Sequence, residues 1–282
     1  MKIKFQIFLC CLLCTGQVLL GQELSEQSLK YINQYGTTIS SRFSTTVVGE
    51  NYYRTQPLNG SFEHYLLNLP LKSFGAKTHL YNGSEKKFNV QIGVVDIKKI
   101  TEEQKSAQII MRLRAEYLYS SRLYGRIHFN FTNGFIFSYA KWAAGFRLND
   151  TKNGWNQSAE QDYSKTTFKN YLDVLYTNTT LSSLSREMNK VTIAEIKIGD
   201  VFIQNGQPGH AVIVMDVLHN DEDKMLKIML AQGNSPAQEL EILRNDIDGS
   251  PWFTLSYDSN DNVKIMTPEW TFYVKDLKRF TN

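Results

Sequence analysis

A histidine and a glutamine lie at the ends of two predicted strands, where they could take part in acid–base chemistry. His210 is the first residue of a very apolar run, residues 210–218, that follows a loop of Asn, Gly and Pro. The next apolar run leads to Gln232. An imidazole supported by a strand can exchange a proton near neutral pH, and an amide beside it can fix the ring tautomer. We therefore expect His210 to act as acid or base and Gln232 to orient it; the alternative is a histidine that only caps a buried strand.

A second set of chemical groups lies on one predicted helix. Arg112 and Glu116 are four residues apart and share a helical face, whereas Arg114 lies on another side. Arginine can grip a carboxylate through two parallel hydrogen bonds, so this helix is a candidate clamp for an anionic group such as a peptide carboxylate. An ordinary ion pair on the helix surface is the alternative.

Two tryptophans and the histidines complete the candidate chemistry. Trp155 and Trp252 lie in segments rich in Asn, Ser, Gly and Pro, where an indole either stacks on a sugar ring or anchors the core. The five histidines show no metal-ligand spacing, so we predict no metal, although zinc held by distant strands is a further alternative. We also predict no cofactor, because no glycine cluster of a nucleotide-binding type opens a helix.

The elements that must position these groups are predicted from periodicity and turn signals. Helices are expected at residues 61–69, 101–119, 135–146, 166–175 and 181–188. Strands are expected at residues 77–81 and 89–95, joined through Asn82-Gly83, and at 198–204, 210–218, 225–230, 238–243 and 270–273. Most helices precede the later strands, so we predict an α+β fold with an antiparallel sheet packed by helices and with N-terminal additions.

The N-terminus has the layout of a secretory signal peptide. Lys2 and Lys4 precede an uncharged apolar run, residues 5–20, and a polar stretch follows at once. We predict a signal peptide at residues 1–21, with a retained anchor as the alternative. A polar segment, residues 22–60, and a single α+β domain, residues 61–282, would follow.

Export with cleavage of the signal peptide would exclude thiol chemistry from the mature protein. All three cysteines, Cys10, Cys11 and Cys14, lie inside the apolar run, so cleavage would remove every thiol. The protein is expected in the periplasm, in the cell envelope or outside the cell. No second apolar stretch is long enough to cross a membrane. The formal net charge of +3 is too small to indicate nucleic-acid binding.

The segment around His210 resembles the histidine half of papain-like cell-wall amidases and endopeptidases of the NlpC and CHAP type. Residues 199–200 and 209–214 carry the resemblance, and Gln232 falls where those enzymes have a third polar residue. The resemblance implies a papain-like fold with its nucleophile at a helix start. Residues 131–135 are similar in shape to that nucleophile segment, which would place Thr132 where the family has cysteine.

A threonine is a weaker nucleophile than a thiolate, so the match implies the fold more directly than the activity. Thr132 also suits a helix cap or a turn, as does its neighbour Asn133. The whole chain further resembles a family of exported bacterial proteins of unknown function. This second resemblance rests on residues 68–71, 79–83, 111–119, 128–134, 210–214, 232, 236–238 and 251–252.

Three function classes follow. The first is a hydrolase-like protein acting on an amide, a peptide or a cell-wall fragment, with His210 as acid or base and Thr132 or water as nucleophile. It requires the Thr132 hydroxyl within hydrogen-bond reach of His210, with both side chains opening onto a cleft. The second is a binding protein for peptidoglycan or glycan fragments that lacks the chemistry, and the third is a structural envelope protein. The residues expected to contact a ligand are Arg112, Arg114, Glu116, Asn133, Trp155 and Trp252.

Overall fold

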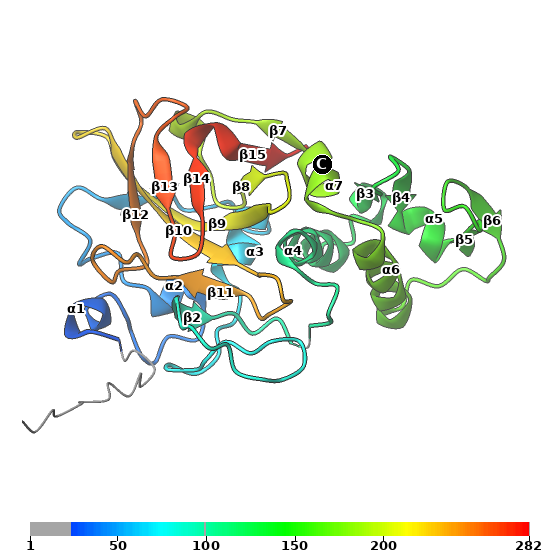
Figure 1. Cartoon of the computed structure of the whole chain (residues 1–282), viewed down its shortest axis with the longest axis horizontal. Coiled ribbons are helices and arrows are strands. Elements are labelled where there is room, and N and C mark those ends of the chain that lie inside the picture. The colour runs from blue at the N-terminus through cyan, green and yellow to red at the C-terminus, as the bar shows by residue number, and fades with distance from the viewer. Residues whose placement is uncertain (1–23, 99, 282) are drawn as a thin grey trace, which may run out of the picture.

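The computed structural model describes residues 24–98 and 100–281. The predicted signal peptide, residues 1–21, lies outside the described residues. Within them the chain is a mixed α+β protein built around one large antiparallel sheet (Figure 1). The α+β class with helices packed on an antiparallel sheet is therefore confirmed.

The large sheet has nine strands. Seven of them follow one another across it: β2 (Gln91–Val94), β11 (Glu241–Leu243), β10 (Met225–Gln232), β9 (His210–Asn220), β8 (Val201–Gln204), β15 (Leu277–Phe280) and β7 (Met188–Lys190). The other two add to its centre, β1 (Tyr53–Arg54) on β9 and β12 (Phe253–Ser256) on β10. The apolar runs predicted as strands thus form its middle, where β9 and β10 are buried on both faces.

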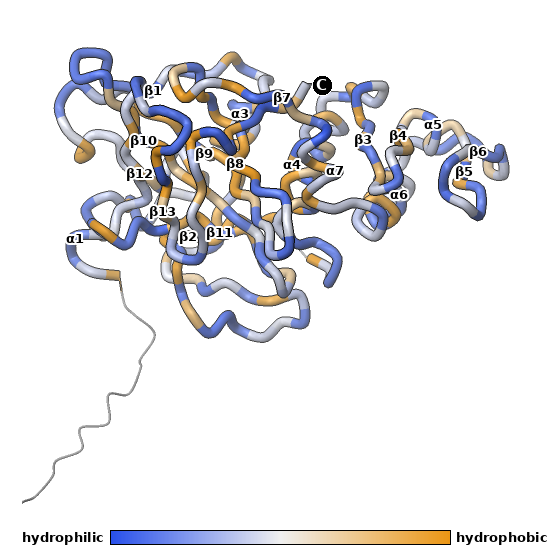
Figure 2. Tube along the Cα trace, turned by 45° about the horizontal axis from the view of Figure 1, so that its top comes forward, coloured by the Kyte–Doolittle hydropathy of each residue, from blue (hydrophilic) through white to orange (hydrophobic). Residues whose placement is uncertain are grey.

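The helix that packs on the centre of the sheet is α4 (Ser106–Ser120), which contacts β9. Ile109, Leu113 and Leu118 are fully buried along it, and α4 lies between the sheet and a lobe beyond it (Figure 1). Figure 2 shows hydrophobic residues on α4 and on the central strands, with polar residues concentrated in the loops. Burial from two sides explains why this helix has little polar surface.

Two shorter helices flank α4. Helix α3 (Phe62–Leu67) begins as predicted at Ser61, whose side chain accepts a hydrogen bond from the His64 amide. Helix α7 (Leu181–Arg186) packs on α4 near strand β7. Both keep α4 fixed relative to the sheet.

The lobe beyond α4 is formed by two small hairpins and two helices (Figure 1). Its elements are β3 (His128–Asn130), β4 (Ile136–Ser138), α5 (Tyr139–Ala143), β5 (Phe146–Leu148), β6 (Trp155–Gln157) and α6 (Lys165–Thr177). Aromatic stacking holds it together, as between Phe137 and Tyr171, whose ring centroids are 4.5 Å apart.

Two predicted elements differ from the structure. The helix expected at residues 135–146 begins only at Tyr139, because residues 136–138 pair with residues 128–130 as a hairpin. The Asn82-Gly83 turn does not join two long strands, because β2 finds its partner in β11, far along the chain. In the first place a local hairpin replaces the start of the helix, and in the second a pairing between distant segments overrides the local turn signal.

The described part of the polar N-terminal segment is packed into the fold. It holds α1 (Glu26–Leu29), α2 (Ile39–Arg42) and β1, and it buries Ile39 and Phe43 completely or nearly so. Arg54 of β1 forms an ion pair with the fully buried Asp216 of β9. The packed structure therefore starts well before residue 61.

A separate hairpin, β13 (Lys264–Met266) and β14 (Thr271–Tyr273), lies near the start of β9. It carries Trp270 and Phe272 toward the ring of His210, with centroids 5.5 and 6.0 Å away. In the described part of the chain, none of the helices has the length and apolar character needed to cross a membrane.

Candidate functional site

His210 and Gln232 meet as predicted. His210 is the first residue of β9, Gln232 is the last residue of the neighbouring β10, and His210 Nε2 lies 2.9 Å from Gln232 Oε1. Gly209 allows the tight turn before the histidine, since a Cβ there would lie 2.8 Å from the Gln204 carbonyl oxygen. The strand pairing thus places imidazole and amide in contact.

The surroundings of Gln232 fix the direction of this hydrogen bond. Gln232 Nε2 donates to Glu241 Oε1 at 2.9 Å and also to Glu269. Ionised carboxylates only accept, so both amide hydrogens point at them and Oε1 must face His210. His210 Nε2 therefore donates to Gln232, and Nδ1 is the unprotonated nitrogen of the neutral ring.

The two carboxylates share a counter-ion. Lys86 Nζ lies 2.7 Å from both Glu241 Oε1 and Glu269 Oε2. Glu241 is fully buried and also accepts from Thr78 and Gln238, each at 2.7 Å. Buried charges that are paired and saturated with hydrogen bonds hold a defined geometry, so this polar cluster is a rigid support for Gln232.

His210 is 4% exposed. Burial lowers its pKa, against the hydrogen bond to Gln232 and the negative charge of Glu269, which raise it. The imidazole is therefore neutral at pH 7, the form that acts as a base. Its Nδ1 makes no hydrogen bond to any of the residues in the described ranges.

Thr132 lies apart from this pair. It stands in the turn between β3 and β4 rather than at a helix start, and its hydroxyl donates to the Asn178 carbonyl at 3.1 Å. Within residues 24–98 and 100–281, no hydrogen bond joins Thr132 to His210. Asn133 is likewise engaged locally, donating to the Lys152 carbonyl at 3.2 Å.

The helix start that packs beside the pair belongs to α4. Gly233 follows Gln232, and a Cβ on it would lie 2.6 Å from the Ile109 side chain in the first turn of α4. Ser106 is the first residue of that helix, 6% exposed, and its hydroxyl has no hydrogen-bond partner among the described side chains and backbone. The sequence missed Ser106 because the predicted helix began at Thr101.

The polar cluster around Gln232 was also missed. Glu241 lies in the predicted strand at residues 238–243, which also contains Glu239, so the sequence did not single out Glu241 as the buried charge. Lys86 and Glu269 come from loops distant in sequence, and no local pattern connects them to Glu241.

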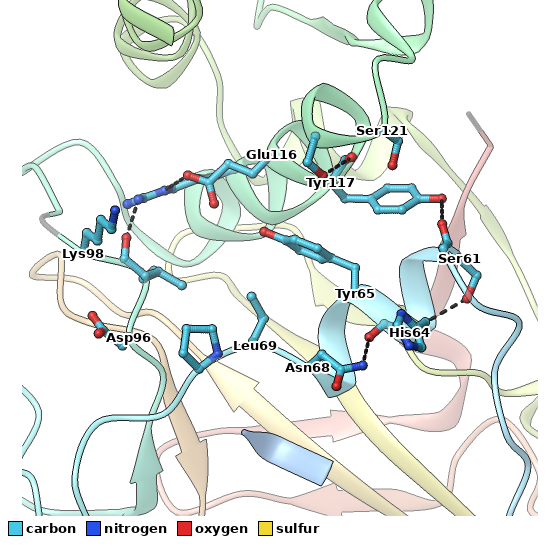
Figure 3. A pocket seen from close by; sticks show the side chains of 15 residues that line it. Ser61, His64, Tyr65, Asn68, Leu69, Asp96, Lys98, Glu116, Tyr117 and Ser121 are labelled. Atoms are coloured by element: carbon cyan, nitrogen blue, oxygen red, sulfur yellow. Dashed lines mark hydrogen bonds and ion pairs between the residues drawn. The ribbon is translucent and has the colours of Figure 1, made fainter. Parts of the chain in front are cut away.

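A cavity of about 520 Å³ lies on the other side of α4, between this helix and α3 (Figure 3). Arg112 and Glu116 line it as an ion pair at 2.8 Å, and Arg112 also donates to Gln104 and to the Ile97 carbonyl. In Figure 3 the Tyr65 ring points toward Glu116. The predicted helical pair therefore exists, but the donors of Arg112 bind groups of the protein itself.

The remaining ligand-contact candidates lie in different surroundings. Trp155 is half-buried and stacks on Phe137, with centroids 5.5 Å apart and planes 10° apart. Trp252 is 1% exposed and belongs to the core, so it offers no ring face to a ligand. Arg114 lines a separate hollow, described below.

Both the side chains of the described residues and comparisons with known proteins bear on identity. The described residues hold no group of three or more His, Cys, Asp or Glu side chains placed to bind a metal ion. A family profile described as Domain of unknown function (4846) matches residues 39–279. The chain belongs to that family. No curated protein and no solved structure matches the chain. The resemblance to NlpC and CHAP enzymes therefore rests on the residues quoted above.

Proposed function

We propose that this member of the family is an exported, hydrolase-like protein with a papain-like arrangement, acting on an amide or peptide bond of a cell-wall fragment. His210 serves as general base through Nδ1, and Gln232 orients the ring. The antiparallel sheet with α4 packed against β9 supports the papain-like arrangement. Lys2, Lys4 and the apolar run after them support export.

One observation carries the proposal. Two carboxylates accept both amide hydrogens of Gln232, so the amide can present only its oxygen to His210. This fixes the ring in the tautomer with a free lone pair on Nδ1. A histidine that merely satisfied a strand end would not need an amide held by two charged groups.

The attacking group in this proposal is a water or the hydroxyl of Ser106. Either becomes nucleophilic when Nδ1 of His210 takes its proton. Thr132 is the weaker candidate because its hydroxyl is bonded to a backbone carbonyl in a hairpin turn. Ser106 is favoured because it begins α4, whose first turn carries Ile109 against Gly233, the residue after Gln232, and because its hydroxyl has no partner among the described residues.

A ligand-binding protein without turnover is the second candidate. The cavity between α3 and α4 favours it, with the rings of Tyr65 and Tyr117 and the carboxylate of Glu116 in its wall. Aromatic rings together with carboxylates and amides suit a sugar or a short peptide.

The test is incubation of the chain without its predicted signal peptide, residues 22–282, with purified peptidoglycan fragments. Turnover is followed as newly released amino groups and by mass spectrometry. We expect His210→Gln to abolish it. Because burial lowers the pKa of His210, we expect the wild-type rate to hold down to about pH 6.5 and to fall only below that pH.

His79→Gln is the matched control, because His79 is a partly exposed histidine paired with Glu239. It should keep the wild-type rate. Ser106→Ala separates the two nucleophiles: a lost activity assigns the serine, and a retained activity assigns water. Equal product from wild type and His210→Gln would remove the hydrolase proposal, and saturable binding without product would then favour the second candidate.

A further inference from the structure

Arg114 is buried among aromatic rings. It projects from α4 and is 7% exposed. Its guanidinium carbon lies 4.9 Å from the ring centroid of Phe62, 5.4 Å from that of Tyr117 and 5.5 Å from that of Phe280. The three rings come from α3, α4 and β15, so the side chain is held where three elements meet.

Among the described residues, the charge of Arg114 has no ionic partner. Its side chain forms no hydrogen bond or ion pair with them, and its Nε is buried without an acceptor. Burial and the nearby charge of Arg126 lower the pKa of Arg114 to about 10, so the guanidinium is still charged at neutral pH. Contact with ring faces attracts a cation but supplies no acceptor for its N–H groups.

The same residue opens onto a polar hollow of about 320 Å³. The charged groups in the wall of this hollow are Glu63, Arg114, Arg126, Asp200 and Arg279. Asp200 is already bound by Arg279, at 2.7 Å. The Asp200 carboxylate is therefore already engaged and does not serve Arg114 as an acceptor.

We propose that this hollow binds a carboxylate group of a small ligand, held by the Arg114 guanidinium. The planar fork of arginine matches the two oxygens of a carboxylate, which would supply the acceptors that Arg114 lacks within the described part of the chain. The inference does not depend on the proposed hydrolase activity, because it concerns a different set of residues.

The experiment measures thermal unfolding of residues 22–282 with sodium acetate or N-acetylalanine, against sodium chloride at equal ionic strength. We expect a saturable rise in Tm with the carboxylates. Arg114→Met should abolish that rise, whereas Arg122→Met, at an exposed arginine, should retain it. Calorimetric titration with N-acetylalanine should show at least a tenfold weaker binding for Arg114→Lys, which keeps the charge but loses the fork.

The lysine variant keeps the test decisive if the methionine variant does not fold. Equal carboxylate-dependent stabilisation of wild type and Arg114 variants would overturn the proposal. So would the absence of any stabilisation, or stabilisation by inorganic phosphate alone.

Discussion

Two buried clusters of charged groups adjoin α4, one around Gln232 and one around Arg114, and they are built differently. Around Gln232, Lys86 binds two carboxylates, and Glu241 also accepts from neutral donors. Around Arg114, a buried cation meets ring faces and a hollow, without an ionic partner in the described ranges. A saturated cluster fixes the geometry of its members, whereas an unsaturated one keeps binding capacity for something else.

The largest effect should come from breaking the saturated cluster. Lys86→Met leaves Glu241 buried without its counter-ion, so we expect the free energy of unfolding to fall by about 3–5 kcal/mol. Denaturant titration measures it, with Lys87→Met at the exposed neighbouring position as control. A loss no larger than that of the control would show that the cluster is not held by its ion pairs.

At the Arg114 cluster, we expect a substitution to raise the free energy of unfolding instead of lowering it. Arg114→Met removes a buried charge that pairs with none of the described carboxylates, so we expect the free energy of unfolding to rise by about 1 kcal/mol in chloride buffer. The same titration compares it with Lys86→Met. A destabilisation of similar size in both variants would erase the distinction between the clusters.

A smaller effect concerns pH. Because burial lowers the pKa of His210 in the folded state, the unfolded chain binds a proton first as pH falls. The histidine therefore costs no stability above about pH 6.5 and destabilises the fold progressively below that pH. His210→Gln should lose less stability than wild type between pH 7.5 and pH 5, in denaturant titrations at both values. Parallel losses would mean that the ring is not held neutral.

The smallest effect is expected at Thr132, outside both clusters. Thr132→Ala removes one hydrogen bond at an exposed hairpin turn, so a loss of about 0.5 kcal/mol is expected. Peptidoglycan turnover, if present in wild type, should not change. A complete loss of turnover with unchanged stability would instead return Thr132 to the catalytic group.

The sequence predicted the parts of the fold that local patterns specify. The periodicity of α4 and the apolar runs of β9 and β10 are long enough to outweigh tertiary context. The short segments at 82–83 and 135–138 are not. Strand β2 pairs with β11, far along the chain, and residues 136–138 pair with residues 128–130 in a local hairpin.

The candidate site also contains residues that local patterns predict and residues that only the folded chain brings together. His210 and Gln232 were predicted because consecutive antiparallel strands bring their ends together. Lys86, Glu241 and Glu269 join them from three separate segments, and that proximity is a property of the folded chain alone. For Trp252 the sequence left sugar stacking and core anchoring open, and the structure shows the indole in the core.

The ion pair between Arg54 and Asp216 has a consequence for where the protein can be cut. Asp216 is fully buried in the middle strand of the sheet, and its counter-ion arrives from a two-residue strand much earlier in the chain. A fragment starting at residue 61 would bury the Asp216 carboxylate without Arg54, the arginine that pairs with it. During synthesis, residue 54 leaves the ribosome long before residue 216. Strand β1 can therefore pair with β9, and Arg54 with Asp216, only after the later strands have been made.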